Sequence, residues 1–136
     1  MNRYEFQKLA DARLEDAEAL LEGSRFDAAY YMAGYAVECA LKACICRKTR
    51  EFDFPPKDAA KLYQHDLHKL SETAGLEGFE KDLRADVVLA QNWGIVKDWN
   101  EQSRYRLLDD AEVRAHRLLR AIRGEQGILR CLSKYW

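Results

Sequence analysis

The stretch RFDAAYYMAGYAVECALKACI, from Arg25 to Ile45, decides the fold of this chain. When it is placed on a helix, apolar residues occur all the way round and no single polar face emerges. Helices of this kind are normally buried among other helices. Small residues alternate with large ones and let neighbouring helices approach closely. They are Ala28, Ala29, Ala33, Gly34, Ala36, Ala40 and Ala43. We therefore expect a central helix that continues to about residue 48.

Two charged residues, Glu38 and Lys42, interrupt this apolar stretch. They are four residues apart with the glutamate first, which is the favourable order for a helical ion pair. One interpretation is a partly solvated pair at the edge of the helix. The other is that Glu38 faces an interior polar pocket. A buried carboxylate is costly unless it is paired, so the second interpretation needs a cation from elsewhere in the chain, for which Arg104 is the candidate.

Length and composition point to one domain over residues 1–136, with a single core. The chain has 22 basic and 23 acidic residues, so no global positive field draws it to nucleic acid, although a local patch is compatible with these counts. The charged opening MNRYEFQKLADARLED does not resemble a secretory signal. No run approaches the ~20 apolar residues that a membrane span needs. We expect a cytoplasmic protein with no membrane partner.

The four cysteines are Cys39, Cys44, Cys46 and Cys131. None of them forms a CxxC pair, so a zinc site is not predicted. We expect reduced thiols that act as small hydrophobic side chains, as in a reducing cytoplasm.

The segment YQHDLHKL contains two histidines, His65 and His68, three residues apart. This spacing suits a metal, but no third ligand stands at a helpful position, and we expect none. The ordinary interpretation is that Asp66 caps a helix carrying Leu67 and Leu70 by accepting backbone N–H bonds.

Helical periodicity and helix-breaking residues divide the rest of the chain. Amphipathic helices are predicted over 3–22, over 57–74 with a break near His65, over 78–92, and after Asp110. Gly94 is expected to end the third of these, and residues 93–106 to form an extended connection. No segment alternates with period two for long enough to form a sheet. The predicted fold is an all-α, up-and-down bundle of four to five helices.

The polar segment WNEQSRY, residues 99–105, contains aromatic anchors. Trp93 and Trp99 are suited to covering the open end of the bundle. Arg104 and Tyr105 are equally suited to a phosphate or a base, because a guanidinium offers forked donors and a phenol ring offers a stacking face.

A basic stripe lies further along the chain, where Arg114, Arg117, Arg120 and Arg123 recur every three residues. It is either a solvated helix face or a surface for RNA phosphates or an acidic partner. The sequence contains no GxGxxG, GxxxxGK[ST] or GxSxG motif, and we expect no cofactor.

Several of these pieces together resemble the HEPN domain family. The central run RFDAAYYMAGYAVECALKACI resembles the second helix of that family. The accompanying pieces are the turn Gly-Ser-Arg-Phe-Asp at 23–27, the HDL at 65–67, and the W-x4-RY formed by Trp99, Arg104 and Tyr105. The resemblance covers nearly the whole chain. It implies a bundle of four or five helices that commonly forms a homodimer.

The resemblance also implies two kinds of function. Many family members are encoded beside a minimal nucleotidyltransferase in toxin–antitoxin or defence modules. Others cut RNA with an Arg followed after four to six residues by a His. Here His65, His68 and His116 all lack an arginine at that spacing. We therefore expect a non-catalytic subunit that binds a nucleotide or nucleic acid and acts with a nucleotidyltransferase.

The candidate pocket combines residues from distant parts of the chain. They are Glu38, Lys42, His65, Trp99, Arg104 and Tyr105. Two alternatives stay open. One is a ribonuclease toxin with a non-standard site, such as His65 with Arg104. The other is a dimeric structural module without a ligand.

Overall fold

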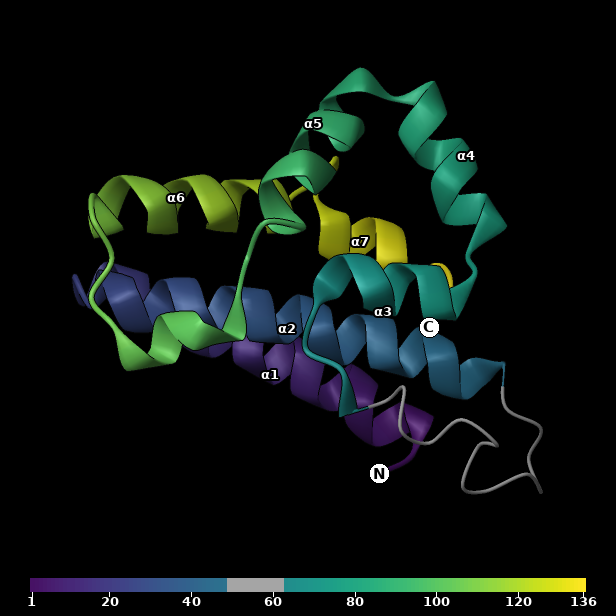
Figure 1. Ribbon diagram of the computed structural model, residues 1–136, viewed down its shortest axis with the longest axis horizontal. Helices are drawn as coiled ribbons and strands as arrows, with labels where there is room; N and C mark the ends of the chain where they lie inside the picture. The colour runs from purple at the N-terminus through teal and green to yellow at the C-terminus, as the bar shows by residue number, and fades with distance from the viewer. Residues whose placement is uncertain (49–62) are drawn as a thin grey trace.

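The computed structural model describes residues 1–48 and 63–136, and in those ranges it contains helices and no strand (Figure 1). The elements are α1 (Arg3–Glu22), α2 (Phe26–Arg47), α3 (Leu67–Ala74), α4 (Glu77–Ala85), α5 (Val87–Val96), the 3-10 helix η2 (Glu101–Tyr105), α6 (Ala111–Ile122) and α7 (Ile128–Leu132). The predicted all-α bundle is confirmed. The first part of the helix expected over 57–74 lies outside the described residues. Among the described helices, none is long and apolar enough to cross a membrane.

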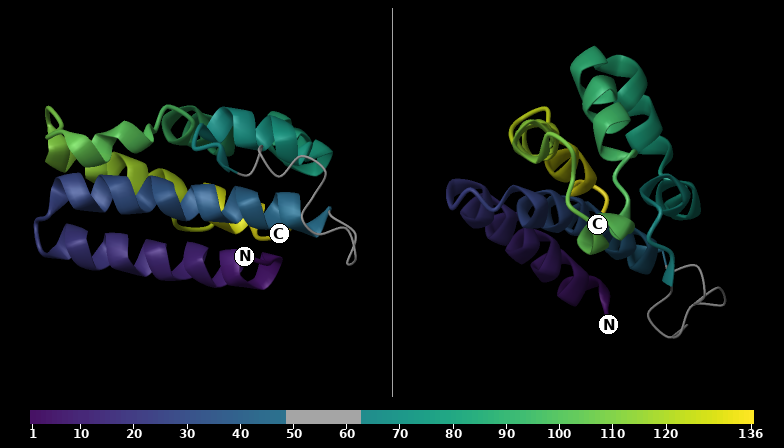
Figure 2. Two further views of the ribbon diagram at one scale, coloured as in Figure 1. Left: turned by 60° about the horizontal axis from the view of Figure 1, so that its bottom comes forward. Right: turned by 60° about the vertical axis from the view of Figure 1, so that its left-hand side comes forward.

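Helices α1 and α2 form an antiparallel pair along the length of the molecule (Figure 2). A capping box starts α1: the Asn2 side chain accepts from the Glu5 N–H at 3.0 Å, and the Glu5 carboxylate accepts from the Asn2 N–H at 2.7 Å. The turn into α2 has a left-handed residue at Ser24, with φ of 59°. Both helices begin and end within two residues of the predicted positions.

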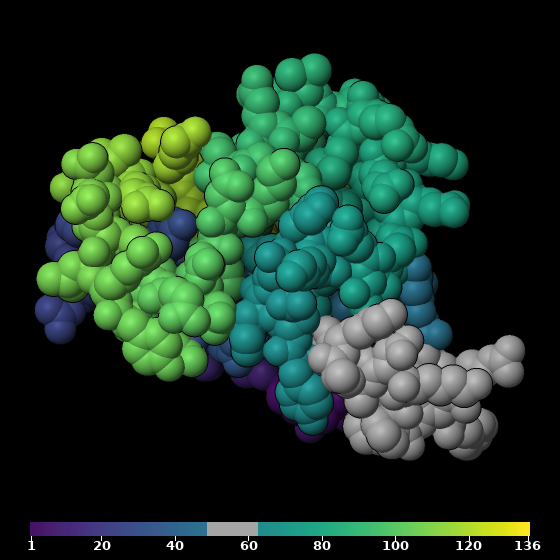
Figure 3. All heavy atoms as spheres, viewed as in Figure 1, coloured from purple at the N-terminus to yellow at the C-terminus, as the bar shows by residue number. Residues whose placement is uncertain are grey.

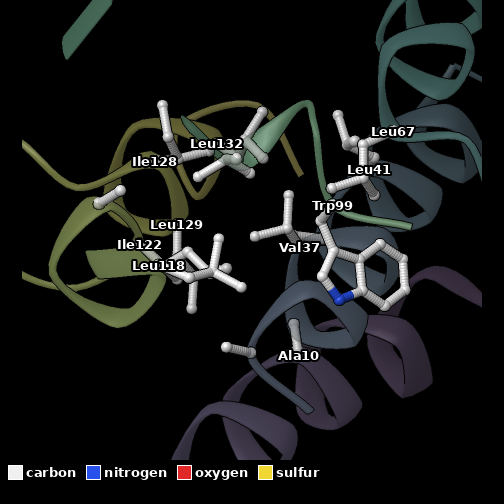
Figure 4. Close-up of a cluster of buried hydrophobic side chains, with 14 of the residues drawn as sticks. Ala10, Val37, Leu41, Leu67, Trp99, Leu118, Ile122, Ile128, Leu129 and Leu132 are labelled. Carbon is white, nitrogen blue, oxygen red and sulfur yellow. The ribbon is translucent and has the colours of Figure 1, made fainter. Parts of the chain in front are cut away.

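The central position of α2 is confirmed. It packs against α1, α3, α6, α7 and η2, and its small residues are buried except Ala28, which is exposed. Figure 4 shows Val37 of α2 between Trp99 and the side chains of α6 and α7, Leu41 of α2 beside Leu67 of α3, and Ala10 of α1 on the other side. A helix enclosed in this way needs apolar residues on every side, which is the pattern that the sequence shows.

The chain from 63 to 105 differs from the prediction after α3. Asp66 caps α3 as expected, accepting from the Lys69 N–H at 3.0 Å. The single helix expected over 78–92 is instead two helices, because the Asp86 side chain accepts from the Leu89 N–H at 3.1 Å and starts α5. Gly94 lies inside α5, and η2 follows, so the predicted extended connection over 93–106 is wrong. Burial of Trp93 and Val96 offsets the ~1 kcal/mol by which glycine disfavours a helix.

One carboxylate ties the C-terminal residues to α4. Asp82 Oδ2 accepts from Lys134 Nζ at 2.8 Å, from the Tyr135 hydroxyl at 2.6 Å and from the Cys131 thiol at 3.4 Å. The hydrogen bonds from Lys134 and Tyr135 lower the pKa of Asp82. The same contact raises the pKa of Tyr135 to about 12, so both groups keep the protonation states that the interaction requires.

All four cysteines are free. Burial raises the pKa of Cys39 to about 11, and that of Cys44 and Cys131 to about 12. Thiols with such pKa values carry almost no thiolate at neutral pH, which agrees with their expected role as small hydrophobic side chains.

Candidate functional site

Trp99 is a core residue that packs directly on Gly34. A Cβ atom at Gly34 would lie 2.2 Å from three atoms of the indole ring, so a side chain at this position is sterically excluded. The indole is only 3% exposed, and Tyr31 lies against it with the ring centroids 5.9 Å apart. Tyr35 stacks on Tyr31 in turn, at 6.1 Å. Trp99 therefore packs in the core beside Tyr31 and has no face free for a ligand.

Glu38 is 1% exposed and is paired within the chain. Its Oε1 lies 2.5 Å from Nδ1 of His65 and 4.0 Å from Nζ of Lys42. Burial raises the pKa of Glu38, while Lys42 and His65 oppose that shift. The expected pairing with Lys42 is confirmed, but the interpretation as a partly solvated pair is wrong, because both side chains are largely buried. The expectation that Arg104 supplies the second cation is wrong, because His65 occupies that place.

The geometry before α3 explains how His65 reaches Glu38. The Gln64 side-chain oxygen accepts from the backbone N–H groups of both His65 and Asp66, each at 3.2 Å. This turn presents the imidazole to α2 immediately before the capped start of α3. We call Glu38, Lys42 and His65 the ion cluster. It fastens the segment before α3 onto α2.

A cleft of about 470 Å³ lies between the start of α2 and the residues of η2. Its lining includes Asp27, Tyr31, Ser103, Arg104, Tyr105 and Arg106, and we call it the η2 cleft. The carboxylate of Asp27 accepts from the Leu108 N–H at 2.6 Å, which holds the chain after η2 against the helix.

Two features of the η2 cleft stand out chemically. The Arg104 guanidinium carbon lies 4.6 Å from the centre of the Tyr105 ring, and a side-chain hydrogen bond to Tyr31 raises the pKa of this arginine. Ser103 is 4% exposed, and its hydroxyl has no hydrogen-bond partner among the described residues. A buried hydroxyl without a partner is disfavoured by ~1–3 kcal/mol, and Ser103 lies in the lining of the η2 cleft.

A family model named HEPN domain matches residues 5–124 of the chain. The chain belongs to the HEPN family. The match begins in α1, ends just after α6, and contains every residue of the ion cluster and the η2 cleft. No curated protein and no solved structure matches the chain.

This HEPN domain divides the six candidate residues between two places. Glu38, Lys42 and His65 form the ion cluster, Arg104 and Tyr105 line the η2 cleft, and Trp99 lies in the core. Tyr31 and Glu38 are seven residues apart on α2, which corresponds to about 10 Å along the helix axis. The candidates therefore do not form one pocket.

Of the residues that line the η2 cleft, sequence reasoning named only Arg104 and Tyr105 as site residues; among those it missed are Tyr31, Ser103 and Arg106. Ser103 and Arg106 flank the Arg104–Tyr105 pair in the sequence, and Tyr31 lies within Arg25–Ile45. Their place beside or inside these segments was the available signal. In residues 1–48 and 63–136, no three His, Cys, Asp or Glu side chains are arranged to hold a metal ion.

Proposed function

We propose that this HEPN domain is a non-catalytic binding subunit whose η2 cleft holds a nucleoside phosphate, either free or at the end of an RNA. The observation that carries this proposal is the lining of the cleft. It combines the guanidinium groups of Arg104 and Arg106, the rings of Tyr31 and Tyr105, and the unpaired hydroxyl of Ser103.

Each of these groups matches one part of such a ligand. Guanidinium groups bind phosphate through forked hydrogen bonds, and tyrosine rings stack on bases of any sequence. Ser103 adds to the lining a buried hydroxyl that has no partner among the described residues. The volume of about 470 Å³ falls within the usual range of small-molecule sites, roughly 300–1,000 Å³.

The sequence spacing of the histidines and the position of His65 favour a binding role over RNA cleavage. The sequence lacks the Arg and His at ribonuclease spacing. His65, the histidine named for a non-standard site, has its Nδ1 engaged by Glu38 rather than placed beside Arg104. The contact with Glu38 leaves Nε2 of His65 for proton transfer, but Arg104, the arginine that would bind the phosphate, lies in the η2 cleft and not in the ion cluster.

The wider setting of the proposal rests on the family. We propose that the domain acts as a homodimer together with a minimal nucleotidyltransferase, within a toxin–antitoxin or defence module and without a cofactor. Co-purification of the chain with the product of a neighbouring nucleotidyltransferase gene tests this setting. A strictly monomeric chain that captures no such partner would contradict it.

Calorimetric titration tests the binding itself, with AMP, ATP and a short RNA as ligands. We expect saturable binding by the wild type. Arg104→Ala should weaken binding at least about tenfold, since charge-assisted hydrogen bonds are the strong ones. Ser103→Ala should weaken it by less. Arg84→Ala is the matched control, because Arg84 is an exposed arginine of α4 outside the cleft.

Two results would overturn the proposal. One is the absence of heat with all three ligands. The other is cleavage of the RNA during incubation with the purified wild type, with cleavage lost in His65→Ala.

A further inference from the structure

A second cleft, of about 480 Å³, lies between α5 and α6. Helix α5 contributes Gln91 and Gly94 to its walls, the chain just after α5 contributes Asp98, and α6 contributes Arg114 and Arg117. Tyr30 of α2 forms part of the base. In Figure 3 the surface is hollowed between the yellow-green α6 and the green α5, and dark blue atoms of α2 are visible between them. No lining residue is shared with the η2 cleft.

The two arginines of this α5–α6 cleft form no ion pair with a carboxylate of the described residues. Arg114 lies over the Tyr30 ring, 5.5 Å from its centre, and Arg117 follows one turn later on the same face of α6. Neither forms an ion pair with a described residue, even though Asp98 lines the same cleft. Further along the same stripe, Arg123 is paired with Glu18 at 3.8 Å. The stripe is therefore divided, with its first two guanidinium groups at the cleft.

Gly94 is an independent sign that the cleft is kept open. A Cβ atom at Gly94 would meet nothing within 4 Å, whereas one at Gly34 or Gly78 would collide with an aromatic ring. Packing therefore does not require glycine at position 94. Glycine inside a helix costs about 1 kcal/mol relative to alanine, and its effect here is to leave one wall of the cleft without a side chain.

We infer that the α5–α6 cleft binds a phosphate monoester of a polyhydroxylated sugar. Arg114 and Arg117 bind the phosphate, and Asp98 and Gln91 bind hydroxyl groups of the sugar. A carboxylate beside two arginines selects against a bare anion and favours a ligand that carries donors as well as a phosphate. A free sugar phosphate and a nucleoside monophosphate share this chemistry.

The test is calorimetric titration with three probes: ribose 5-phosphate, AMP and inorganic phosphate. We expect wild type to bind ribose 5-phosphate more tightly than inorganic phosphate. Arg117→Ala should weaken this binding about tenfold or more, and Gly94→Leu should abolish it by filling the cleft. The matched controls are Arg120→Ala, on the same helix but outside the cleft, and Gly94→Ala. Both should bind within about twofold of wild type, because they leave the lining groups in place.

The result with AMP separates this inference from the proposed function. If AMP also binds here, a second equivalent of AMP is lost in Arg117→Ala and kept in Ser103→Ala. The inference is overturned if AMP binding is weakened only by Ser103→Ala and ribose 5-phosphate does not bind. The proposed binding of AMP at the η2 cleft would then still stand. Equal affinity for inorganic phosphate and ribose 5-phosphate also overturns the inference, as does unchanged binding in Gly94→Leu or an equal loss in Arg120→Ala.

Discussion

The polar groups at the middle of α2 and those of η2 beside its N-terminal end are in opposite states. In the middle, Glu38 is buried and its charge is met by His65 and Lys42 from the same chain. At the N-terminal end, Ser103 and Arg104 line a cleft, and the buried Ser103 hydroxyl has no partner among the described residues. The two places therefore differ in whether the chain itself supplies partners for their buried polar groups.

The largest expected effect concerns the packed middle of α2. Gly34→Leu should lower the free energy of unfolding by about 3 kcal/mol, because its side chain collides with Trp99. Urea denaturation of wild type and variant measures the change. Gly94→Leu is the control, since a side chain there enters open space. Equal midpoints for Gly34→Leu and wild type would show that Trp99 does not pack on this position.

The next effect addresses the ion cluster. Glu38→Ala should lower the free energy of unfolding by about 2 kcal/mol, because it leaves a cavity and removes the carboxylate that His65 and Lys42 contact. Glu38→Gln keeps the volume and should lower the same quantity by less, about 1 kcal/mol. If the two variants melt together at the wild-type temperature, Glu38 is not buried in a paired state.

A pH titration of stability distinguishes two carboxylates whose pKa values are shifted in opposite directions. The pKa of Glu38 is raised by burial. Its contribution to the free energy of unfolding is therefore fully present below the usual glutamate pKa of 4.5 and is lost as the pH rises through the pKa in the folded state. The pKa of Asp82 is lowered by Lys134 and Tyr135, so its contribution is present above 3.8 and is lost as the pH falls through the folded pKa.

Melting temperatures between about pH 3 and pH 7 measure these contributions. Asp82→Asn should remove part of the acid-side loss of stability, and Glu38→Gln should remove part of the loss as the pH rises above 4.5. Parallel curves for wild type and both variants would contradict the two assignments.

The smallest expected effect is that of His65→Ala. The His65 side chain is 48% exposed, so its removal leaves Glu38 access to Lys42 and to solvent. We expect the free energy of unfolding to fall by no more than about 1 kcal/mol, as is typical of half-exposed ion pairs. A loss as large as that of Glu38→Ala would mean that His65 is the dominant partner of the carboxylate.

Local signals in the sequence were enough for part of this structure. The apolar and small residues of Arg25–Ile45 predicted the central helix, and Asp66 predicted the start of α3, because helix burial and capping depend on neighbours along the chain. The same logic failed at Asp86, where a capping aspartate splits a stretch whose periodicity reads as one helix.

The contacts of the candidate site depend on tertiary packing, so they could not be predicted from neighbouring residues in the sequence. Nothing near Glu38 in sequence indicates that His65, 27 residues away, is its partner. Likewise, the fit of Trp99 onto Gly34 follows from how η2 is placed against α2. The types of residue were predicted, but their division between the ion cluster and the η2 cleft needed the fold.

One measurement tests the difference between these two places most directly: the affinity for AMP of Arg104→Ala and Lys42→Ala, determined by calorimetry beside wild type. The two variants each remove one cation, from the η2 cleft and from the ion cluster respectively. We predict that Arg104→Ala weakens binding about tenfold or more, while Lys42→Ala leaves the affinity within about twofold of wild type. A loss of affinity in Lys42→Ala, with none in Arg104→Ala, would place the site in the ion cluster and contradict the account.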